Sequence, residues 1–103
     1  MLEIDRMVQR WDEAVDTYCK ALQCSRIAEQ KVKASYAARF KAYKGSMGVE
    51  EARQSVYDDR EYNAAVRESI DAEVDTQRAK LDLEGKRLAV EVWRTQQANM
   101  RRV

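Results

Sequence analysis

Apolar residues recur at steps of three and four along the first part of the chain. Such spacing places them on one face of an α-helix and resembles the seam of a coiled coil. The members of this series are Ile4, Val8, Trp11, Val15, Tyr18 and Leu22, and then Val32, Tyr36, Phe40 and Tyr43; between the two groups, Ser25 and Glu29 occupy the seam positions. We therefore predict a helix over residues 3–44.

The apolar pattern stops at residues 45–48, which we predict to form a turn. Lys41 and Lys44 suit the last turn of a helix, and Gly45 suits the left-handed conformation that often follows one. A second series predicts another helix over residues 48–100. Its members are Val49, Ala52, Val56, Asn63, Val66, Ile70, Val74, Leu81, Leu88 and Val92.

An antiparallel pairing aligns the two series when paired residue numbers sum to about 92. Leu22 then faces Ile70, and Trp11 faces Leu81. Charge favours the same pairing, because it sets neighbouring blocks of opposite sign side by side. The net charges are −2, +5, −6 and +4 for residues 1–30, 31–48, 49–75 and 76–103, respectively. The predicted fold is all-α: one domain over residues 1–103, forming a long antiparallel two-helix hairpin of coiled-coil type.

The C-terminal end and two stripes along the helices have no facing segment within the predicted hairpin, which indicates contact with other proteins. Residues 92–103 extend past the start of the first helix as a C-terminal overhang. Small residues form a column on the first helix at Ala14, Ala21, Ala28 and Ala42, and a second stripe follows Ala72, Ala79, Leu83 and Val90. We expect a twofold homodimer that forms a four-helix bundle over part of its length. The candidate interaction residues are Leu83, Val90, Trp93, Arg94, Met100, Arg101 and Arg102.

The residue types present do not assemble into a catalytic pattern. The chain has no histidine, so the commonest general base is missing, and it has no glycine-rich phosphate loop. We expect no enzyme activity, no cofactor and no metal.

Cys19 and Cys24 lie about 140° apart on a helix, and we expect free thiols in or near packing. The carboxylates of residues 58–75 are expected to form a solvated, ion-paired face. Gly85 is interpreted as leaving room for the indole of Trp11.

Charge and hydropathy bear on location and partners. The net charge of +1 produces no strong field toward nucleic acid or membrane. No apolar run is long enough to span a bilayer, and the acidic start lacks the order of a signal peptide, so we expect a cytoplasmic protein. Weak nucleic-acid binding through the basic overhang beside Trp93 remains open.

Three segments resemble small helical proteins of tailed phages and prophages, which are often encoded among DNA replication and recombination genes. They are Lys41-Ala42-Tyr43-Lys44-Gly45-Ser46, Glu50-Glu51-Ala52-Arg53, and Val92-Trp93-Arg94-Thr95-Gln96-Gln97-Ala98-Asn99-Met100-Arg101. The resemblance implies a non-enzymatic accessory protein that acts by protein–protein interaction in the bacterial host cytosol, in single-strand DNA replication or recombination. An inhibitor of a host defence or regulatory protein is the alternative.

A second resemblance is to the WXG100 secreted proteins of Gram-positive bacteria. The length, the hairpin and the mid-chain turn are similar. Tyr43-Lys44-Gly45 stands where that family has Trp-x-Gly, and Tyr57-Asp58-Asp59-Arg60-Glu61 looks like its Tyr-x-x-x-Glu signal. This resemblance implies a secreted hairpin protein.

Overall fold

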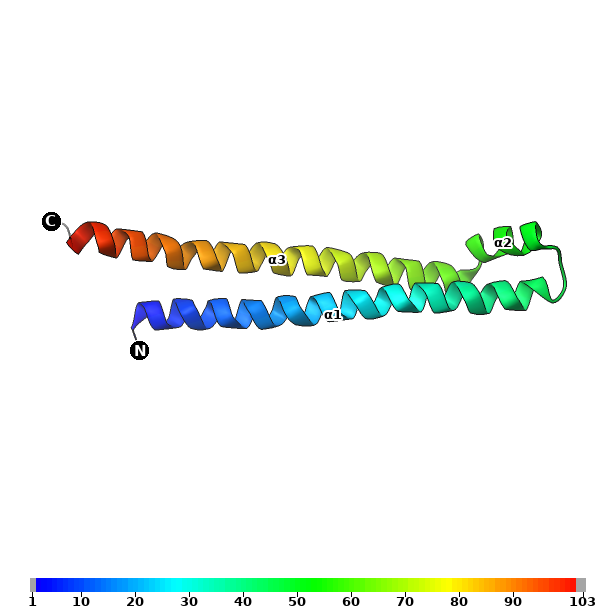
Figure 1. Ribbon diagram of the computed structural model, residues 1–103, viewed down its shortest axis with the longest axis horizontal. Coiled ribbons are helices and arrows are strands. Elements are labelled where there is room, and N and C mark those ends of the chain that lie inside the picture. The colour runs from blue at the N-terminus through cyan, green and yellow to red at the C-terminus, as the bar shows by residue number, and fades with distance from the viewer. Residues whose placement is uncertain (1, 102–103) are drawn as a thin grey trace. The chain divides into compact units, whose positions relative to one another are not determined.

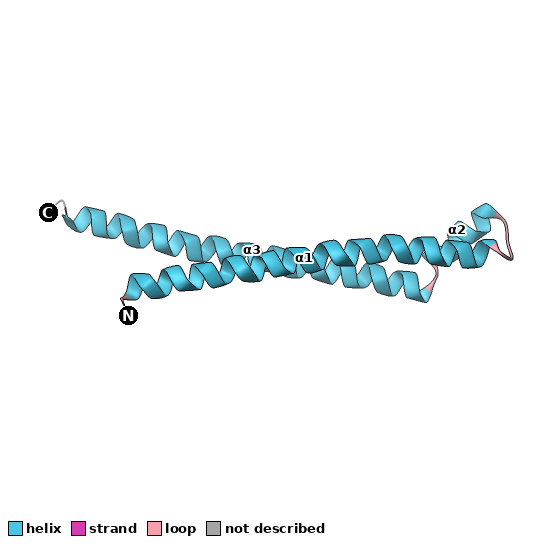
Figure 2. Ribbon diagram, turned by 60° about the horizontal axis from the view of Figure 1, so that its bottom comes forward, coloured by secondary structure: helices cyan, strands magenta, loops and turns pink. Residues whose placement is uncertain are grey.

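The computed structural model describes residues 2–101, and within that range it consists of α-helices joined by short loops (Figures 1 and 2). Helix α1 spans Glu3–Lys44, α2 spans Val49–Tyr57 and α3 spans Arg60–Arg101. The predicted all-α fold is confirmed, and the first helix has the predicted bounds. The second predicted helix is interrupted, because residues 58 and 59 separate α2 from α3.

Contacts divide the chain into two units, each described here by itself. Unit 1 comprises the chain up to Ala21 and from Asp75 onward, and unit 2 comprises Leu22–Val74. In each unit, a segment of α1 runs antiparallel to a segment of α3 (Figure 1). The antiparallel pairing expected from the sequence is therefore present, with α2 as an additional element of unit 2.

The most deeply buried side chains of the helix contact in unit 1 are small or medium-sized. Ala14 of α1 and Thr76 and Val90 of α3 are buried. The hydroxyl of Thr76 donates a hydrogen bond of 3.1 Å to the carbonyl oxygen of Ala21. Larger side chains such as Trp11 and Leu83 are half-buried, whereas Leu81 and Leu88 are exposed.

Unit 2 combines a small apolar core with ion pairs between helices. Ala28 of α1 and both Ala52 and Val56 of α2 are buried. Ion pairs between α1 and the α2–α3 segment are Lys31–Glu68 at 3.2 Å, Arg39–Asp59 at 2.9 Å and Arg39–Glu61 at 3.7 Å. They join the positive block to the negative block, as the charge pattern predicted.

The pairing register changes where α2 ends. In the α2 region the ring centroids of Tyr36 and Tyr57 lie 6.1 Å apart, and these residue numbers sum to 93, close to the predicted 92. At the start of α3 the ring centroids of Tyr36 and Tyr62 lie 5.8 Å apart, and these residue numbers sum to 98. Asp58 ends α2 with φ −93° and ψ −3°, and the helical hydrogen-bond ladder restarts at Arg60. A shift of about five residues turns a helix by about 140°, so another face of α3 becomes the buried one.

This rotation overturns the predicted buried face of the second helix. Leu81 and Leu88 were expected in the seam and are exposed, whereas Val90 was expected on an outer stripe and is fully buried. The small-residue column on the first helix is also wrong as an outer surface, because Ala14 and Ala28 are buried within the chain. Ala42 of the same column is exposed.

Two interpretations of glycines are also wrong. No glycine in the described residues has a positive φ, so Gly45 is not left-handed; the chain instead leaves α1 with a hydrogen bond from the amide of Ser46 to the carbonyl of Tyr43. A Cβ added at Gly85 would meet nothing within 4 Å. Gly85 is therefore not required for the packing of Trp11.

Candidate interaction face on helix α3

A row of large apolar side chains follows one side of α3. We call this row the α3 face, and its members are Ile70, Val74, Leu81, Leu88 and Val92. Their exposed fractions range from 43% for Val74 to 68% for Leu81. At 100° per residue the five side chains lie within an arc of about 40°, and buried Val90 lies about 180° from Leu81. The row therefore runs along the side of the helix opposite its buried contact.

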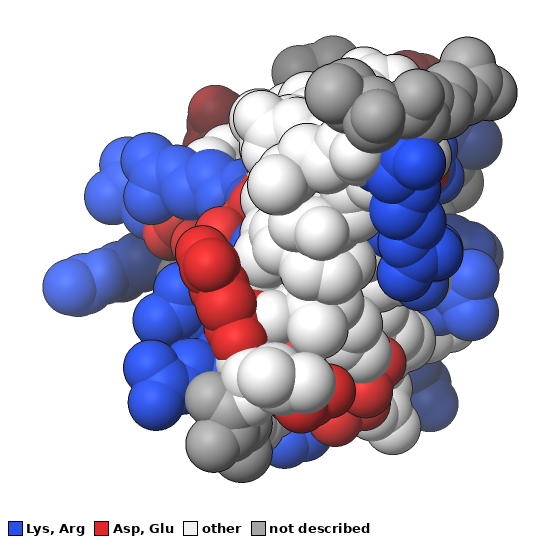
Figure 3. Space-filling view, turned by 90° about the vertical axis from the view of Figure 1, so that its left-hand side faces the viewer, with Lys and Arg blue, Asp and Glu red and all other residues white. Residues whose placement is uncertain are grey.

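Charged side chains border the α3 face. Arg78 and Asp82 lie along one edge and Lys80 and Glu84 along the other, as their positions on the helix require. Asp82 also accepts a 2.8 Å contact from Lys86 in the same helix. Figure 3 looks at the end of unit 1 rather than along the α3 face, and there too uncharged side chains lie between charged ones. An apolar strip with a charged border is typical of a surface that binds protein.

An open groove of about 440 Å³ in unit 1 adjoins this face. Its lining residues are Glu3, Met7, Gly85, Leu88, Ala89, Val92, Trp93 and Gln96. Leu88 and Val92 thus belong both to the face and to the groove, and half-buried Trp93 forms part of the groove wall. The groove has few polar groups and no set of convergent ones, so it offers shape and apolar contact rather than chemistry.

The predicted interaction residues do not form one surface. Val90 is fully buried within the chain, so its assignment as an outer contact is wrong, whereas Leu83 is half-buried and its role as a contact stays a prediction. Arg94, Met100 and Arg101 are exposed at the end of α3. Arg102 lies outside the described residues.

A polar cluster in unit 2 explains why α3 begins where it does. Asp59 is 6% exposed, and one of its carboxylate oxygens accepts hydrogen bonds from Tyr43 Oη at 2.6 Å and Arg39 Nε at 2.9 Å. The other oxygen accepts the backbone amide of Tyr62 at 3.0 Å, which is the geometry of a helix N-cap. Asn63 adds a hydrogen bond to the carbonyl of Tyr57 at the end of α2. The cluster fixes both ends of the helix break.

Hydrogen bonds set the acidity of Asp59. The bonds from Tyr43, from the Tyr62 amide and from Arg39 stabilise the carboxylate and lower the pKa of Asp59 from 3.8 to about 2. The expectation that all carboxylates of residues 58–75 are solvated is wrong at this position. An aspartate just before a helix is a known start signal, but the continuous apolar series around it concealed the break.

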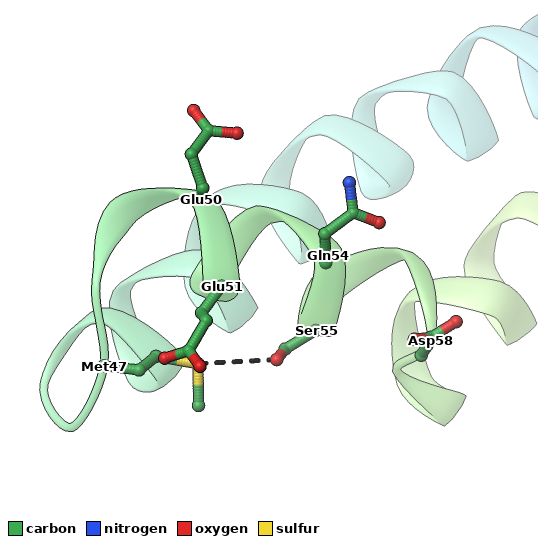
Figure 4. Close-up of a pocket in the computed structure, with 6 residues that line it drawn as sticks. All are labelled: Met47, Glu50, Glu51, Gln54, Ser55 and Asp58. Atoms are coloured by element: carbon green, nitrogen blue, oxygen red, sulfur yellow. Dashed lines mark hydrogen bonds between the residues drawn. The ribbon is translucent and has the colours of Figure 1, made fainter.

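A second concave surface lies along α2 and has a volume of about 470 Å³ (Figure 4). The carboxylates of Glu50, Glu51 and Asp58 point in different directions there, and the hydroxyl of Ser55 donates to the sulfur of Met47 at 3.4 Å. Across the described residues, no group of three or more potential ligands is placed to hold a metal ion.

Cys19 and Cys24 are free thiols, as predicted, and both are exposed rather than packed.

Among residues 2–101, no helix combines the length and the apolar character needed to cross a membrane. Comparison of the chain with protein-family models, curated proteins and solved structures finds no match.

Proposed function

We propose that this chain is a non-enzymatic protein that acts by binding other proteins. The α3 face is the observation that carries this proposal. Its five large apolar side chains remain exposed on the side of α3 opposite buried Val90. Exposed apolar strips of this kind are costly to leave in water and mark contact surfaces in natural proteins.

The resemblance to phage and prophage helical proteins supplies the setting of the proposal. In that setting the chain is an accessory protein that binds a component of single-strand DNA replication or recombination. Binding and inhibition of a host defence or regulatory protein is the alternative. Both roles require an accessible protein-binding surface and no catalytic group, which agrees with the α3 face.

Affinity capture from a bacterial lysate tests the proposal. We expect the wild-type chain to retain a phage replication protein or a host protein, identified by mass spectrometry, and the double variant Leu81→Glu, Leu88→Glu to lose it. Ile27→Glu is the matched control, because Ile27 is an exposed apolar residue on α1 with an exposed fraction of 51%. Capture that is equal for all three chains would show that the α3 face does not bind the partner.

A further inference from the structure

We propose that the α3 face binds the same face of a second copy of the chain. The two α3 helices run antiparallel, and a twofold axis passes beside Leu81. This inference rests on the proposed function, because it names one partner for the surface that carries it. It differs from the dimer expected from the sequence, whose contact residues include Val90, which is fully buried within the chain.

The spacing of apolar residues on α3 is symmetric about Leu81. Val74 and Leu88 each lie seven residues from it, and Ile70 and Val92 each lie eleven residues from it. In an antiparallel twofold pair, a residue at a given distance before the axis faces the residue at the same distance after it. Every large apolar side chain of the face therefore meets another one, along about 33 Å of helix.

The same symmetry places Gly85 beside a long side chain of the second copy. Gly85 lies four residues after Leu81 on the same edge of the face as Arg78, which lies three residues before Leu81, so Gly85 lies beside the partner's Arg78 across the twofold axis. Nothing in the chain lies within 4 Å of a Cβ added at Gly85, so packing within the chain does not account for this glycine. In the antiparallel pair it leaves space for the longer side chain of the partner's Arg78.

Charge complementarity selects the antiparallel arrangement. In such a pair, each edge of the face meets the same edge of the second copy, as in antiparallel coiled coils. Arg78 then lies beside the partner's Asp82, and Lys80 lies beside the partner's Glu84. The twofold axis repeats both pairs, so the four contacts nearest the axis join opposite charges. Further out, Glu73 and Glu91 lie on the Lys80–Glu84 edge, eight residues before and ten residues after Leu81, and bring carboxylates together.

A parallel pair reverses this balance. Opposite edges of the face then meet, so Arg78 lies beside the partner's Lys80, and Asp82 lies beside the partner's Glu84. All four border contacts become like-charged, which disfavours the parallel arrangement. Within the described part of the chain Arg78, Lys80 and Glu84 form no ion pair, so their charges are available to a second copy.

Light scattering on the purified chain is the first test. We expect a mass about twice the 12.0 kDa of one chain at high micromolar concentration. Leu81→Glu should reduce it to that of one chain while circular dichroism keeps the same helix content, because Leu81 is exposed within the chain. Ile27→Glu should leave the dimer intact. A wild-type mass of one chain, or a Leu81→Glu chain that still dimerises, would overturn the inference.

A symmetric crosslink tests the position of the axis. In a Cys19→Ser, Cys24→Ser background, Leu81→Cys should form a disulfide-linked dimer on mild oxidation, because the axis brings the two substituted positions together. The matched control retains Cys19 alone, an exposed thiol on α1, and should stay unlinked. A dimer that forms in solution but is not linked through position 81 would place the interface elsewhere.

A charge exchange tests the direction of the helices. Lys80→Glu and Glu84→Lys should each raise the dimer Kd about tenfold, because each places like charges at two symmetric contacts. The double variant should restore a Kd close to that of the wild type. A double variant as weak as the single ones would exclude the antiparallel arrangement.

Failure of this inference and failure of the proposed function give different results. A wild-type chain that is monomeric but captures a protein through the α3 face overturns the self-association and leaves the proposed function in place. A dimer with the expected crosslink that captures no other protein supports the self-association and overturns the accessory role.

Discussion

At the scale of single residues, Asp59 connects three elements of unit 2. Its carboxylate accepts hydrogen bonds from Arg39 and Tyr43 of α1 and caps the first turn of α3 at Tyr62. It also directly follows the last turn of α2. A buried carboxylate with several donors is stabilising only while all of its partners are present.

Asp59→Ala should therefore lower the thermal unfolding midpoint clearly, because it removes the helix cap and leaves Arg39 and Tyr43 without their shared acceptor. Asp58→Ala is the matched control, since Asp58 is exposed and takes part through its backbone amide. The midpoints can be compared by circular dichroism at neutral pH. Equal midpoints for the two variants would contradict the role assigned to the cluster.

Acidification should weaken the fold through the same residue. The pKa of Asp59 is lowered from 3.8 to about 2, so its carboxylate stabilises the folded state above pH 3.8. That contribution is lost as the pH falls toward 2. The difference in unfolding midpoint between the wild type and Asp59→Asn should shrink over this interval. A constant difference from neutral pH down to pH 2 would contradict the lowered pKa.

Gly85 provides an opposite prediction, a gain in stability. It lies inside α3, and an added Cβ would meet nothing within 4 Å of the same chain, so in the Leu81→Glu background, which removes the proposed dimer contact, Gly85→Ala should raise the free energy of unfolding by about 0.5–1 kcal/mol. Gly48→Ala is the control, because Gly48 is the N-cap of α2, where alanine is disfavoured. Urea denaturation at equal chain concentration measures both. A loss of stability in Gly85→Ala would indicate a packing role for the glycine.

At the scale of elements, the two-residue break between α2 and α3 decides which face of α3 is buried. The register sum rises from 93 at Tyr57 to 98 at Tyr62, and the shift exchanges the stripe of Leu81 and Leu88 for that of Leu83 and Val90. Helical periodicity identified both stripes, but it could not choose between them. The choice depends on contacts between Asp59 and a helix 20 residues away.

Engineered crosslinks can measure this register. In a background without Cys19 and Cys24, cysteines at Ala21 and Thr76 should form a disulfide within one chain, because the side chain of Thr76 reaches the backbone of Ala21 at 3.1 Å. Cysteines at Leu22 and Ile70, which match the register sum of 92, are the control and should not link. The reverse result, read on a non-reducing gel, would restore the predicted register.

At the scale of the whole molecule, charge argues against tight DNA binding. The net charge is +1, and Trp93, the aromatic residue beside the basic C-terminal residues, is half-buried in the groove. We expect little complex with single-stranded DNA in mobility-shift assays at moderate salt, and little change in Arg94→Ala, Arg101→Ala. A tight, salt-sensitive complex that this double variant abolishes would favour a nucleic-acid function.

The sequence by itself determined the helices and the sense of their pairing. The bounds of α1 follow from continuous apolar spacing, with acidic residues in its first turn and basic residues in its last. The antiparallel sense follows from charge blocks that the Lys31–Glu68 and Arg39–Glu61 pairs connect as expected. These features depend on neighbours in sequence or on the net charge of long segments. They can therefore be predicted even when the assumed register is wrong by a few residues.

Only the tertiary structure decided which face of α3 is buried and which is exposed. Each residue of shift turns a helix by 100°, so a five-residue change in register replaces one stripe by nearly the opposite one. The end of α2, the start of α3 and the exposure of the α3 face all depend on where Asp59 finds its donors. Those donors are Arg39 and Tyr43, which only folding brings to Asp59.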